Sequence, residues 1–151
     1  SKKNTSLVQV QQAPAVGAEA IQVVYNRIER QAETQILPLC LRQNLGVLAR
    51  VPLASGFLSG KYTKDAQFAP GDVRAVWQSE QERRTMIEQV EEIRKEVPRG
   101  VPLAHWALAW CLRNPAVSCV IPGCKNIEQV EFNAKAADLA DVSEDHPQAV
   151  K

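Results

Sequence analysis

A glycine-led turn followed by a lysine lies in residues 121–129, which read IPGCKNIEQ. Gly123 lets the backbone approach a ligand closely, and Lys125 adds a positive charge beside the first free amide groups of a predicted helix. Such a turn at the carboxyl end of a parallel strand is typical of an anion-binding site. A capped helix with a surface lysine explains the same residues. Spacing alone favours that simpler interpretation, because no complete glycine-rich fingerprint is present.

A second candidate is the loop in residues 50–62, which read RVPLASGFLSGKY. This loop follows a predicted strand and contains Gly56, Gly60 and Lys61. Glycines permit the positive φ angles from which anion-binding backbone nests are built. A plain connecting loop accounts for these residues at least as well.

The third candidate is Tyr25, an aromatic residue at the carboxyl end of the first predicted strand. Its ring can stack on a flat ligand, although such residues more often pack in the core or at its rim. His105 is expected to pack inside an apolar helix, His146 lies in the tail, and Glu91 and Glu92 belong to a charged helix face. No catalytic triad, carboxylate pair or metal-ligand spacing is apparent. We therefore predict neither a catalytic residue nor a metal site.

Four cysteines, Cys40, Cys111, Cys119 and Cys124, form no C-x-x-C pair and show no zinc-site spacing. We expect reduced thiols in or near the core of a cytoplasmic protein. No apolar run approaches the roughly 18 residues of a membrane span, so no membrane association is expected. The net charge of +1, without a basic stripe, gives no indication of nucleic-acid binding.

The elements that must position these candidates follow from apolar patterning. The composition, 45% hydrophobic and 23% charged over 151 residues, is that of one globular domain spanning residues 1–151. Near-continuous apolar runs predict parallel strands covered on both faces. These strands are expected near residues 20–25, 46–50 and 117–121. Helical patterns lie between them, and this alternation predicts an α/β fold.

Several helix boundaries are also predicted. Gly46 is expected as the left-handed residue that ends the second helix. Residues 79–97 form an amphipathic helix whose apolar face contains Met86, Val90, Ile93 and Val97. The apolar segment 101–114 is expected to be a buried helix. Asn126 is predicted to cap the last helix, with Gln129 arranged almost as in a capping box.

The chain from residue 4 to residue 139 resembles the aldo-keto reductases, and in particular the C-terminal half of that family's (β/α)8 barrel. The resemblance rests on four segments in the family's order and spacing: IQVVYN, GVLARVPLASGFLSGKY, VPLAHWALAW and NPAVSCVIPGCKNIEQVEFNAKAADL. Several motifs in register are more specific than any one of them, and they favour a ligand-binding role for the turn around Lys125. The implied fold is a half TIM barrel, with parallel strands alternating with helices.

The resemblance implies an NADP(H) cofactor extended across the carboxyl-terminal mouth of the barrel. Gln22 matches a glutamine near the nicotinamide carboxamide, Tyr25 matches an aromatic that stacks on the nicotinamide, and Asn4 matches an asparagine that bonds the carboxamide. The segment that folds over the pyrophosphate comprises Pro52, Leu53, Ser55, Gly56 and Leu58, with Lys61 adjacent to it. The segment that holds the 2′-phosphate and adenine comprises Gly123, Lys125, Gln129 and Asn133.

Three positions depart from the family pattern. Lys3 stands in place of a serine, Arg50–Val51 in place of a common tyrosine–serine pair, and Phe132 in place of a frequent glutamate. The family's catalytic aspartate, tyrosine, lysine and histidine belong to the first half of the barrel, and no segment here resembles that half.

Three strands cannot close a barrel, which typically needs about 250 residues. Their open edges present unpaired backbone groups. We therefore expect self-association, strand swapping or a complementing half-barrel chain. A fragment of a reductase, a natural half-barrel and a partial fold adapted for binding all remain open.

Two functions follow from these considerations. The first is an oxidoreductase polypeptide that moves hydride between NADP(H) and a small carbonyl substrate, with its catalytic residues outside this chain. The second is a non-catalytic nucleotide-binding or protein-interaction module. In either case we expect weak binding of NADP(H) by this chain alone, with the preference for NADP(H) carried by Lys125.

Overall fold

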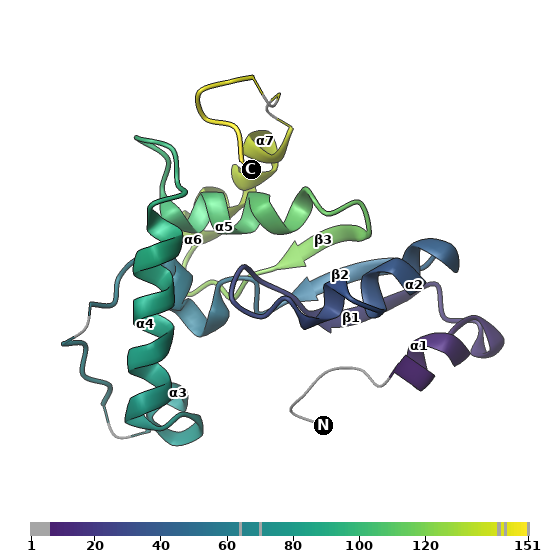
Figure 1. The fold of residues 1–151 in the computed structure, drawn as a ribbon, viewed down its shortest axis with the longest axis horizontal. Helices are drawn as coiled ribbons and strands as arrows, with labels where there is room; N and C mark the ends of the chain where they lie inside the picture. The colour runs from purple at the N-terminus through teal and green to yellow at the C-terminus, as the bar shows by residue number, and fades with distance from the viewer. Residues whose placement is uncertain (1–6, 64, 70, 142, 144, 151) are drawn as a thin grey trace.

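Three parallel strands form the centre of the structure, a computed structural model that describes residues 7–63, 65–69, 71–141, 143 and 145–150. The strands are β1 (Ala20–Val24), β2 (Gly46–Arg50) and β3 (Val117–Ile121), in the order β1–β2–β3 (Figure 1). All three lie within one residue of their predicted positions. Sequential parallel strands with helices between them have the architecture of part of a (β/α)8 barrel, so the predicted fold class is confirmed.

Helices and short 3-10 turns form the connections between the strands. The α-helices are α1 (Leu7–Gln12), α2 (Ile36–Arg42), α3 (Val73–Trp77), α4 (Glu80–Arg94), α5 (Leu103–Leu112), α6 (Ile127–Ala134) and α7 (Ala136–Ala140). The 3-10 turns are η1 (Pro14–Val16), η2 (Gln31–Glu33) and η3 (Ala54–Ser59). No helix in the described part of the chain combines the length and apolar character needed to cross a bilayer.

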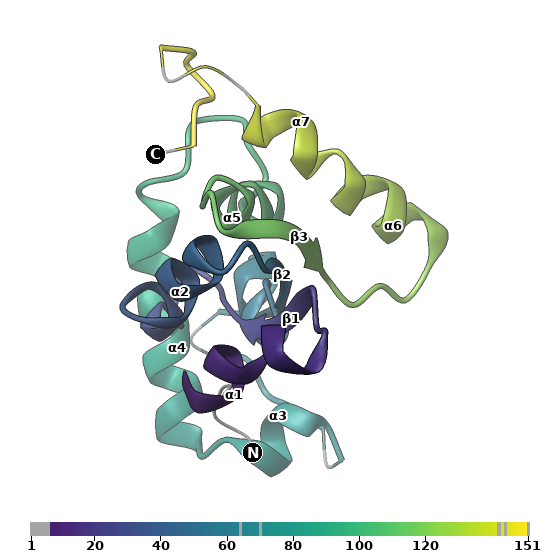
Figure 2. The same ribbon diagram turned by 90° about the vertical axis from the view of Figure 1, so that its right-hand side faces the viewer.

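One face of the sheet packs against helices α2 and α5 (Figure 2). Val47 and Ala49 of β2 are completely buried on this face, in a cluster that includes Leu37 of α2 and Cys111 of α5. The residues of β2 that alternate with Val47 and Ala49 are only partly buried, as expected when side chains alternate across a strand. The sheet therefore has a helix-covered face and a second face that is open to other contacts.

An irregularity in β3 determines which of its residues face the open side. Val47 pairs with Val117, whereas Leu48 pairs with Cys119, so Ser118 is an extra residue in the ladder. The Ser118 hydroxyl oxygen accepts a hydrogen bond from the Val47 amide at 3.1 Å, which satisfies a backbone donor at the bulge. Beyond the bulge, Cys119 shares a face with Leu48.

A second core lies between α4, α5 and η3. Ile87, Val90 and Ile93 of α4 pack with Trp106 of α5 and Phe57 of η3. The predicted apolar face of α4 is thus confirmed at Val90 and Ile93. Ile87 is buried beside them, while Met86 and Val97 are partly buried. The predicted burial of α5 is also confirmed.

Two predicted helix boundaries are wrong. Gly46 does not end α2 but opens β2, because the helix stops at Arg42 and Asn44 takes the left-handed conformation at φ 53°. Asparagine tolerates this region better than most residues. The predicted last helix is two helices, which meet at Lys135. The second, α7, buries Ala136 and packs against α5, whereas α6 buries none of its residues.

Helix α4 begins with a complete capping box. The Ser79 hydroxyl oxygen accepts from the Glu82 amide at 3.2 Å, and the Glu82 carboxylate accepts from the Ser79 amide at 2.7 Å. We predict that Ser79→Ala lowers the free energy of unfolding by about 1 kcal/mol, because the Glu82 amide loses the hydroxyl oxygen that accepts its hydrogen bond. Urea denaturation measures this change. Thr85→Ala, at an exposed site within α4, is the control and should be neutral or slightly stabilising; equal losses for both variants would contradict the prediction.

Candidate functional site

The carboxyl ends of the three strands form one row across the sheet. Val24 pairs with Arg50, and Arg50 pairs with Ile121. The loops that follow these residues therefore leave the sheet from the same edge. Ligands of parallel α/β proteins bind at this edge, and the structure brings the predicted cofactor segments after β2 and β3 to this side of the sheet.

Gln22 lies on the open face of the sheet. Its side chain is exposed, and its Cα partner in the ladder is Leu48, which pairs in turn with Cys119. A ligand that crosses the open face can therefore reach Gln22. The contact with a nicotinamide carboxamide that the family resemblance implies for Gln22 stays a prediction.

The loop after β2 contains a concentration of unusual backbone angles. Val51, Ala54 and Ser55 have φ values of 56°, 48° and 55°, and Gly56 has a φ of 92°. A β-branched residue such as Val51 is a genuine outlier in this region. Strain of this kind persists where surrounding contacts enforce it, and it clusters at ligand-binding sites. The loop predicted to cover a pyrophosphate is therefore the most strained part of the described backbone.

The side chains of this loop differ in their access to a ligand. Ser55 is exposed, Leu53 and Gly56 are partly buried, and Pro52 and Leu58 are buried. Leu58 belongs to the second core with Phe57. Only its main chain, and not its side chain, is therefore available for the role predicted for Leu58.

Arg74 of α3 makes hydrogen bonds that hold the loop after β2 in place. Its guanidinium donates to both Asp72 carboxylate oxygens, at 2.7 and 2.5 Å, to the Tyr62 hydroxyl, and to the Ser55 carbonyl at 3.4 Å. These hydrogen bonds lower the pKa of Asp72 to about 2, and Lys125 adds a smaller electrostatic contribution. The segment around Asp72 and the turn after β3 are therefore close enough to interact electrostatically. The sequence offered no motif that indicates the role of Arg74.

Side chains of α6 form hydrogen bonds with the turn that joins β3 to this helix. The Asn126 side chain accepts from the Gln129 amide at 2.9 Å, which confirms Asn126 as the cap of α6. The Gln129 side chain accepts from the Lys125 amide at 2.8 Å, and the Asn133 amide nitrogen donates to the Cys124 sulfur at 3.2 Å. Gln129 and Asn133 thus stabilise the turn, and an adenine contact has to use their remaining polar atoms.

Gly123 and Lys125 are both exposed in this turn. The Gly123 backbone is not left-handed, and a Cβ atom added there would meet no described atom within 4 Å. The glycine therefore keeps the approach to the turn open, and no special backbone angle requires it. The Lys125 ammonium forms no hydrogen bond or ion pair with any residue of the described chain, so it remains available to an anion.

Tyr25 does not present a stacking surface, contrary to the role predicted for it. Its ring is 1% exposed and lies against Trp110, with centroids 5.3 Å apart. Its hydroxyl donates to Glu33 at 2.8 Å and accepts from Asn114 at 3.3 Å. Burial, followed by the hydrogen bond to Glu33, raises the pKa of Tyr25 above its ordinary value. The physical reason is strand alternation: Tyr25 shares the helix-covered face with Val23.

Asn26 is a buried residue beside the candidate site, and the sequence did not reveal its contacts. It is completely buried, and its side-chain oxygen accepts from the amides of Ile28 and Glu29 at 3.0 and 2.8 Å. Its amide nitrogen donates to the Val51 carbonyl at 3.1 Å and to the Glu29 carboxylate at 3.0 Å. Asn26 thereby ties the loop after β1 to the strained residue that begins the loop after β2.

His105 makes a packing contact in the structure. His105 stacks on Phe132 with centroids 3.8 Å apart, and its ring nitrogen contacts the Phe132 carbonyl oxygen. No group of histidine, cysteine or acidic side chains in the described residues is arranged to hold a metal ion.

The four cysteines are free, but only two lie in the core. Cys40 and Cys111 are buried, and burial raises the pKa of the Cys111 thiol to about 12. Cys119 and Cys124 are exposed, so the prediction of core or near-core positions is wrong for these two. Cys119 lies on the open face of the sheet, and Cys124 lies in an exposed turn.

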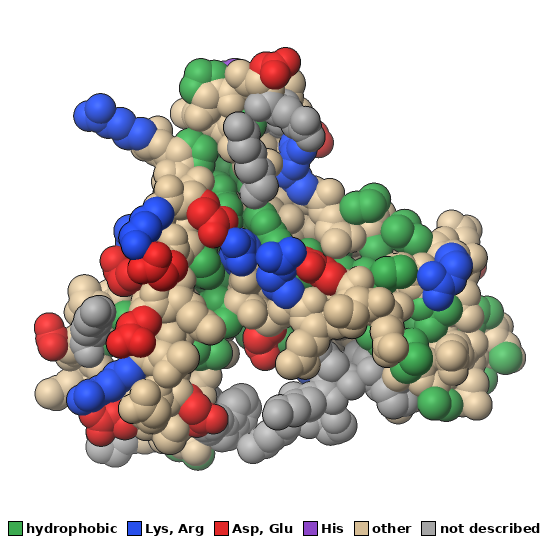
Figure 3. All heavy atoms as spheres, in the orientation of Figure 1, with side chains coloured by type: hydrophobic (Ala, Val, Ile, Leu, Met, Phe, Trp, Pro, Cys, Tyr) green, Lys and Arg blue, Asp and Glu red, His purple; other side chains and the backbone are tan. Residues whose placement is uncertain are grey.

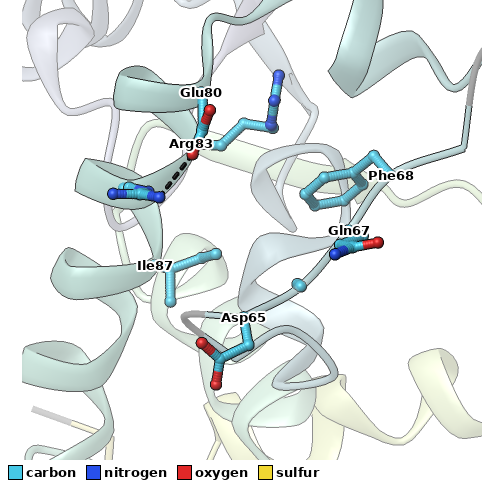
Figure 4. Close-up of a pocket in the computed structure, with 8 residues that line it drawn as sticks. Asp65, Gln67, Phe68, Glu80, Arg83 and Ile87 are labelled. Atoms are coloured by element: carbon cyan, nitrogen blue, oxygen red, sulfur yellow. Dashed lines mark hydrogen bonds and ion pairs between the residues drawn. The ribbon is translucent and has the colours of Figure 1, made fainter.

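A cavity of about 510 Å³ lies between residues 65–68 and the first half of α4 (Figure 4). Its wall includes the Glu80–Arg84 ion pair at 2.6 Å and the ring of Phe68. None of the predicted cofactor residues lines this cavity. The candidate site is therefore the shared edge of the three strands rather than this hollow.

We predict that Asn26→Ala lowers the free energy of unfolding by about 3 kcal/mol, because the completely buried Asn26 side chain makes partly buried hydrogen bonds to the backbone of Val51, Ile28 and Glu29, and all of them are lost. Denaturant unfolding measures the loss. The control is Asn44→Gly, which removes an exposed asparagine at a left-handed position that glycine accommodates and should change stability by less than about 0.5 kcal/mol. A loss below about 1 kcal/mol for Asn26→Ala would show that this network is dispensable.

Comparison with known proteins places the chain in a family. The model of the "Aldo/keto reductase family" matches residues 2–151. A probable voltage-gated potassium channel subunit beta of Arabidopsis thaliana is 37% identical over 134 residues, covering 82% of this chain and 40% of that protein. The NADH-specific methylglyoxal reductase of Escherichia coli is 30% identical over 124 residues, covering 80% of this chain and 37% of that protein.

The fold comparison agrees with the sequence comparison. The holo form of an aldo-keto reductase from Bacillus halodurans has a TM-score of 0.65 and 22% identity, covering 91% of this chain and 42% of the other. The chain thus spans about two fifths of the curated relatives and structures that it matches. The position predicted for Asn4 lies outside the described residues. With the matched model covering residues 2–151, the chain belongs to the aldo-keto reductase family.

Proposed function

We propose that this chain is the cofactor-binding C-terminal half of an NADP(H)-dependent carbonyl reductase. The observation that carries the proposal is the single row formed by Val24, Arg50 and Ile121, from which the loops bearing the predicted cofactor residues depart. The nicotinamide cofactor supplies the hydride in such a reductase. The residues of this chain bind and orient it, and a proton donor for the carbonyl oxygen comes from outside the chain.

The residues present fit an extended dinucleotide. Gln22 faces the open side of the sheet for the nicotinamide amide, and the strained main chain at Ser55 and Gly56 suits a pyrophosphate. Lys125, unpaired at the start of α6 and beside the open approach at Gly123, suits a 2′-phosphate. Tyr25 takes no part, since its ring is buried.

Two features support completion of the barrel by further strands. The outer edges of β1 and β3 pair with no described strand, and open edges favour strand pairing. Exposed apolar side chains lie near both edges: Val8, Val16 and Leu41 around α1 and α2, and Ile127 and Val130 on α6. Figure 3 shows the hydrophobic side chains gathered over the α1–α2 end. A complementing half-barrel, in the same polypeptide or in a second chain, would cover these edges and apolar side chains. A second copy of this chain is the alternative partner for the same surfaces.

We predict that NADPH binds more tightly than NADH, and that Lys125→Ala weakens NADPH binding by about one to two decades while leaving NADH binding unchanged. The loss corresponds to a charge-assisted contact with the 2′-phosphate. Calorimetric titration measures both affinities. The matched control is Lys135→Ala at the other end of α6. Equal affinities for the two cofactors, or an unchanged NADPH affinity in Lys125→Ala, would leave the turn as an ordinary capped helix.

We further predict that the 151-residue chain alone does not oxidise NADPH in the presence of simple aldehydes. A protein in which this chain is joined to, or assembled with, the first half of the barrel should do so, because that half supplies the group that polarises the carbonyl. The measurement is loss of NADPH absorbance in both samples. Clear turnover by the pure 151-residue chain would mean that a catalytic group lies within it.

A non-catalytic interaction module is the second candidate function. The observation that favours it is that several relatives are named as potassium channel beta subunits, including the plant protein that is 37% identical. NADP(H) binding by the gene-length protein, without aldehyde reduction, would favour this second function over the first.

A further inference from the structure

Arg50 is the only charged residue in the three described strands. It is the last residue of β2, the central strand, and thus lies at the carboxyl edge where ligands of this architecture bind. The other strand residues are apolar or neutral. A single charge at this position calls for an explanation, because ionised side chains are rarely placed in a sheet without a partner.

The Arg50 side chain belongs to the open face of the sheet. Val47 and Ala49 point to the helix-covered face with no exposed surface, so Arg50 lies on the opposite side. It is partly buried, and its ladder partners are the aliphatic residues Val24 and Ile121. The guanidinium is therefore set among apolar neighbours beside the face that Gln22 also occupies.

No acidic side chain neutralises this charge. The carbonyl of Arg50 accepts from the Tyr25 amide at 3.3 Å, but its guanidinium has no hydrogen bond, ion pair or aromatic partner among the residues that the structure describes. Other arginines of the chain are paired: Arg27, Arg30, Arg74, Arg84 and Arg94 each contact a carboxylate. A partly buried guanidinium without an acidic neighbour has donors that an anion can accept from.

The backbone that carries Arg50 is fixed in place. The next residue, Val51, has a φ of 56°, and its carbonyl accepts from the buried Asn26 side chain at 3.1 Å. The strained turn therefore cannot relax without breaking a buried hydrogen bond. A fixed backbone limits the region that the Arg50 guanidinium can reach, and the parallel N–H donors of a guanidinium favour two-point contact with a carboxylate or phosphate.

We propose that Arg50 binds an anionic oxygen group at the mouth of the site. This inference deepens the proposed function and rests on it for the identity of the ligand, which is either a pyrophosphate oxygen of the dinucleotide or a carboxylate carried by the carbonyl substrate. The carboxylate is planar and the phosphate is tetrahedral, and each presents two oxygens that can accept hydrogen bonds from one guanidinium.

The direct test needs neither cofactor nor turnover. The protein at its gene-encoded length is titrated by calorimetry with inorganic pyrophosphate and with benzoate. The wild type should bind at least one of them, Arg50→Gln should bind it about tenfold or more weakly, and Arg50→Lys should fall between the two. Arg42→Gln, an exposed arginine at the end of α2, is the control and should match the wild type. Arg50→Lys also serves if Arg50→Gln fails to fold.

Two further comparisons identify the source of the anion. If the pyrophosphate is the ligand, Arg50→Gln weakens NADPH binding but leaves binding of adenosine 2′,5′-bisphosphate unchanged, since that nucleotide lacks the pyrophosphate bridge. If the substrate is the ligand, NADPH binding is unchanged and KM rises about tenfold for 4-carboxybenzaldehyde but not for the uncharged 4-nitrobenzaldehyde.

The outcomes separate the two proposals. Binding of neither pyrophosphate nor benzoate, or equal binding by wild type and Arg50→Gln, overturns the role of Arg50. Anion binding that depends on Arg50, in a protein that binds no NADP(H), overturns the proposed function and leaves Arg50 as the anion site. NADP(H) binding that is insensitive to Arg50, in a protein that binds neither probe, leaves the proposed function standing and overturns the inference.

Discussion

The hydrogen bond from the Asn26 amide to the Val51 carbonyl is the contact on which the candidate site depends. It joins the loops of two adjacent strands, and it holds Val51 in a conformation that a β-branched residue avoids on its own. The strained loop after β2 and the backbone beside Arg50 both begin at this contact. The surrounding core can maintain the strain because Asn26 is completely buried and its other polar atoms are satisfied.

The strands and the α/β class were predictable because they depend on local patterns. Apolar, β-branched runs indicated β1, β2 and β3 without knowledge of any distant contact. Asn126 was recognised as a cap for the same reason, since its partner, Gln129, lies only three residues away. Asn26 was not, because its partner, Val51, is 25 residues away and neither residue type indicates the contact.

The errors at the site also have a physical origin. Tyr25 lies one residue beyond β1, and its orientation depends on whether the strand alternation continues past the last ladder pair. It does continue, and the ring turns into the core beside Trp110. Gly46 was taken for a helix end because glycine prefers left-handed angles, yet Asn44 already provides that turn. In both cases several local solutions were available, and packing of the neighbouring elements selected one.

Helix α6 buries none of its residues, although it follows the turn that carries Lys125. Its attachment to the rest of the described chain depends on its own capping contacts, on the stacking of Phe132 against His105 and on the buried Ala136 of α7. Segments with few buried contacts open locally at a fraction of the free energy of global unfolding. We therefore expect the turn around Lys125 and α6 to open more readily than the sheet. A phosphate bound at this turn would slow the hydrogen exchange of the amides in α6. The exchange rates of the strand amides would change little.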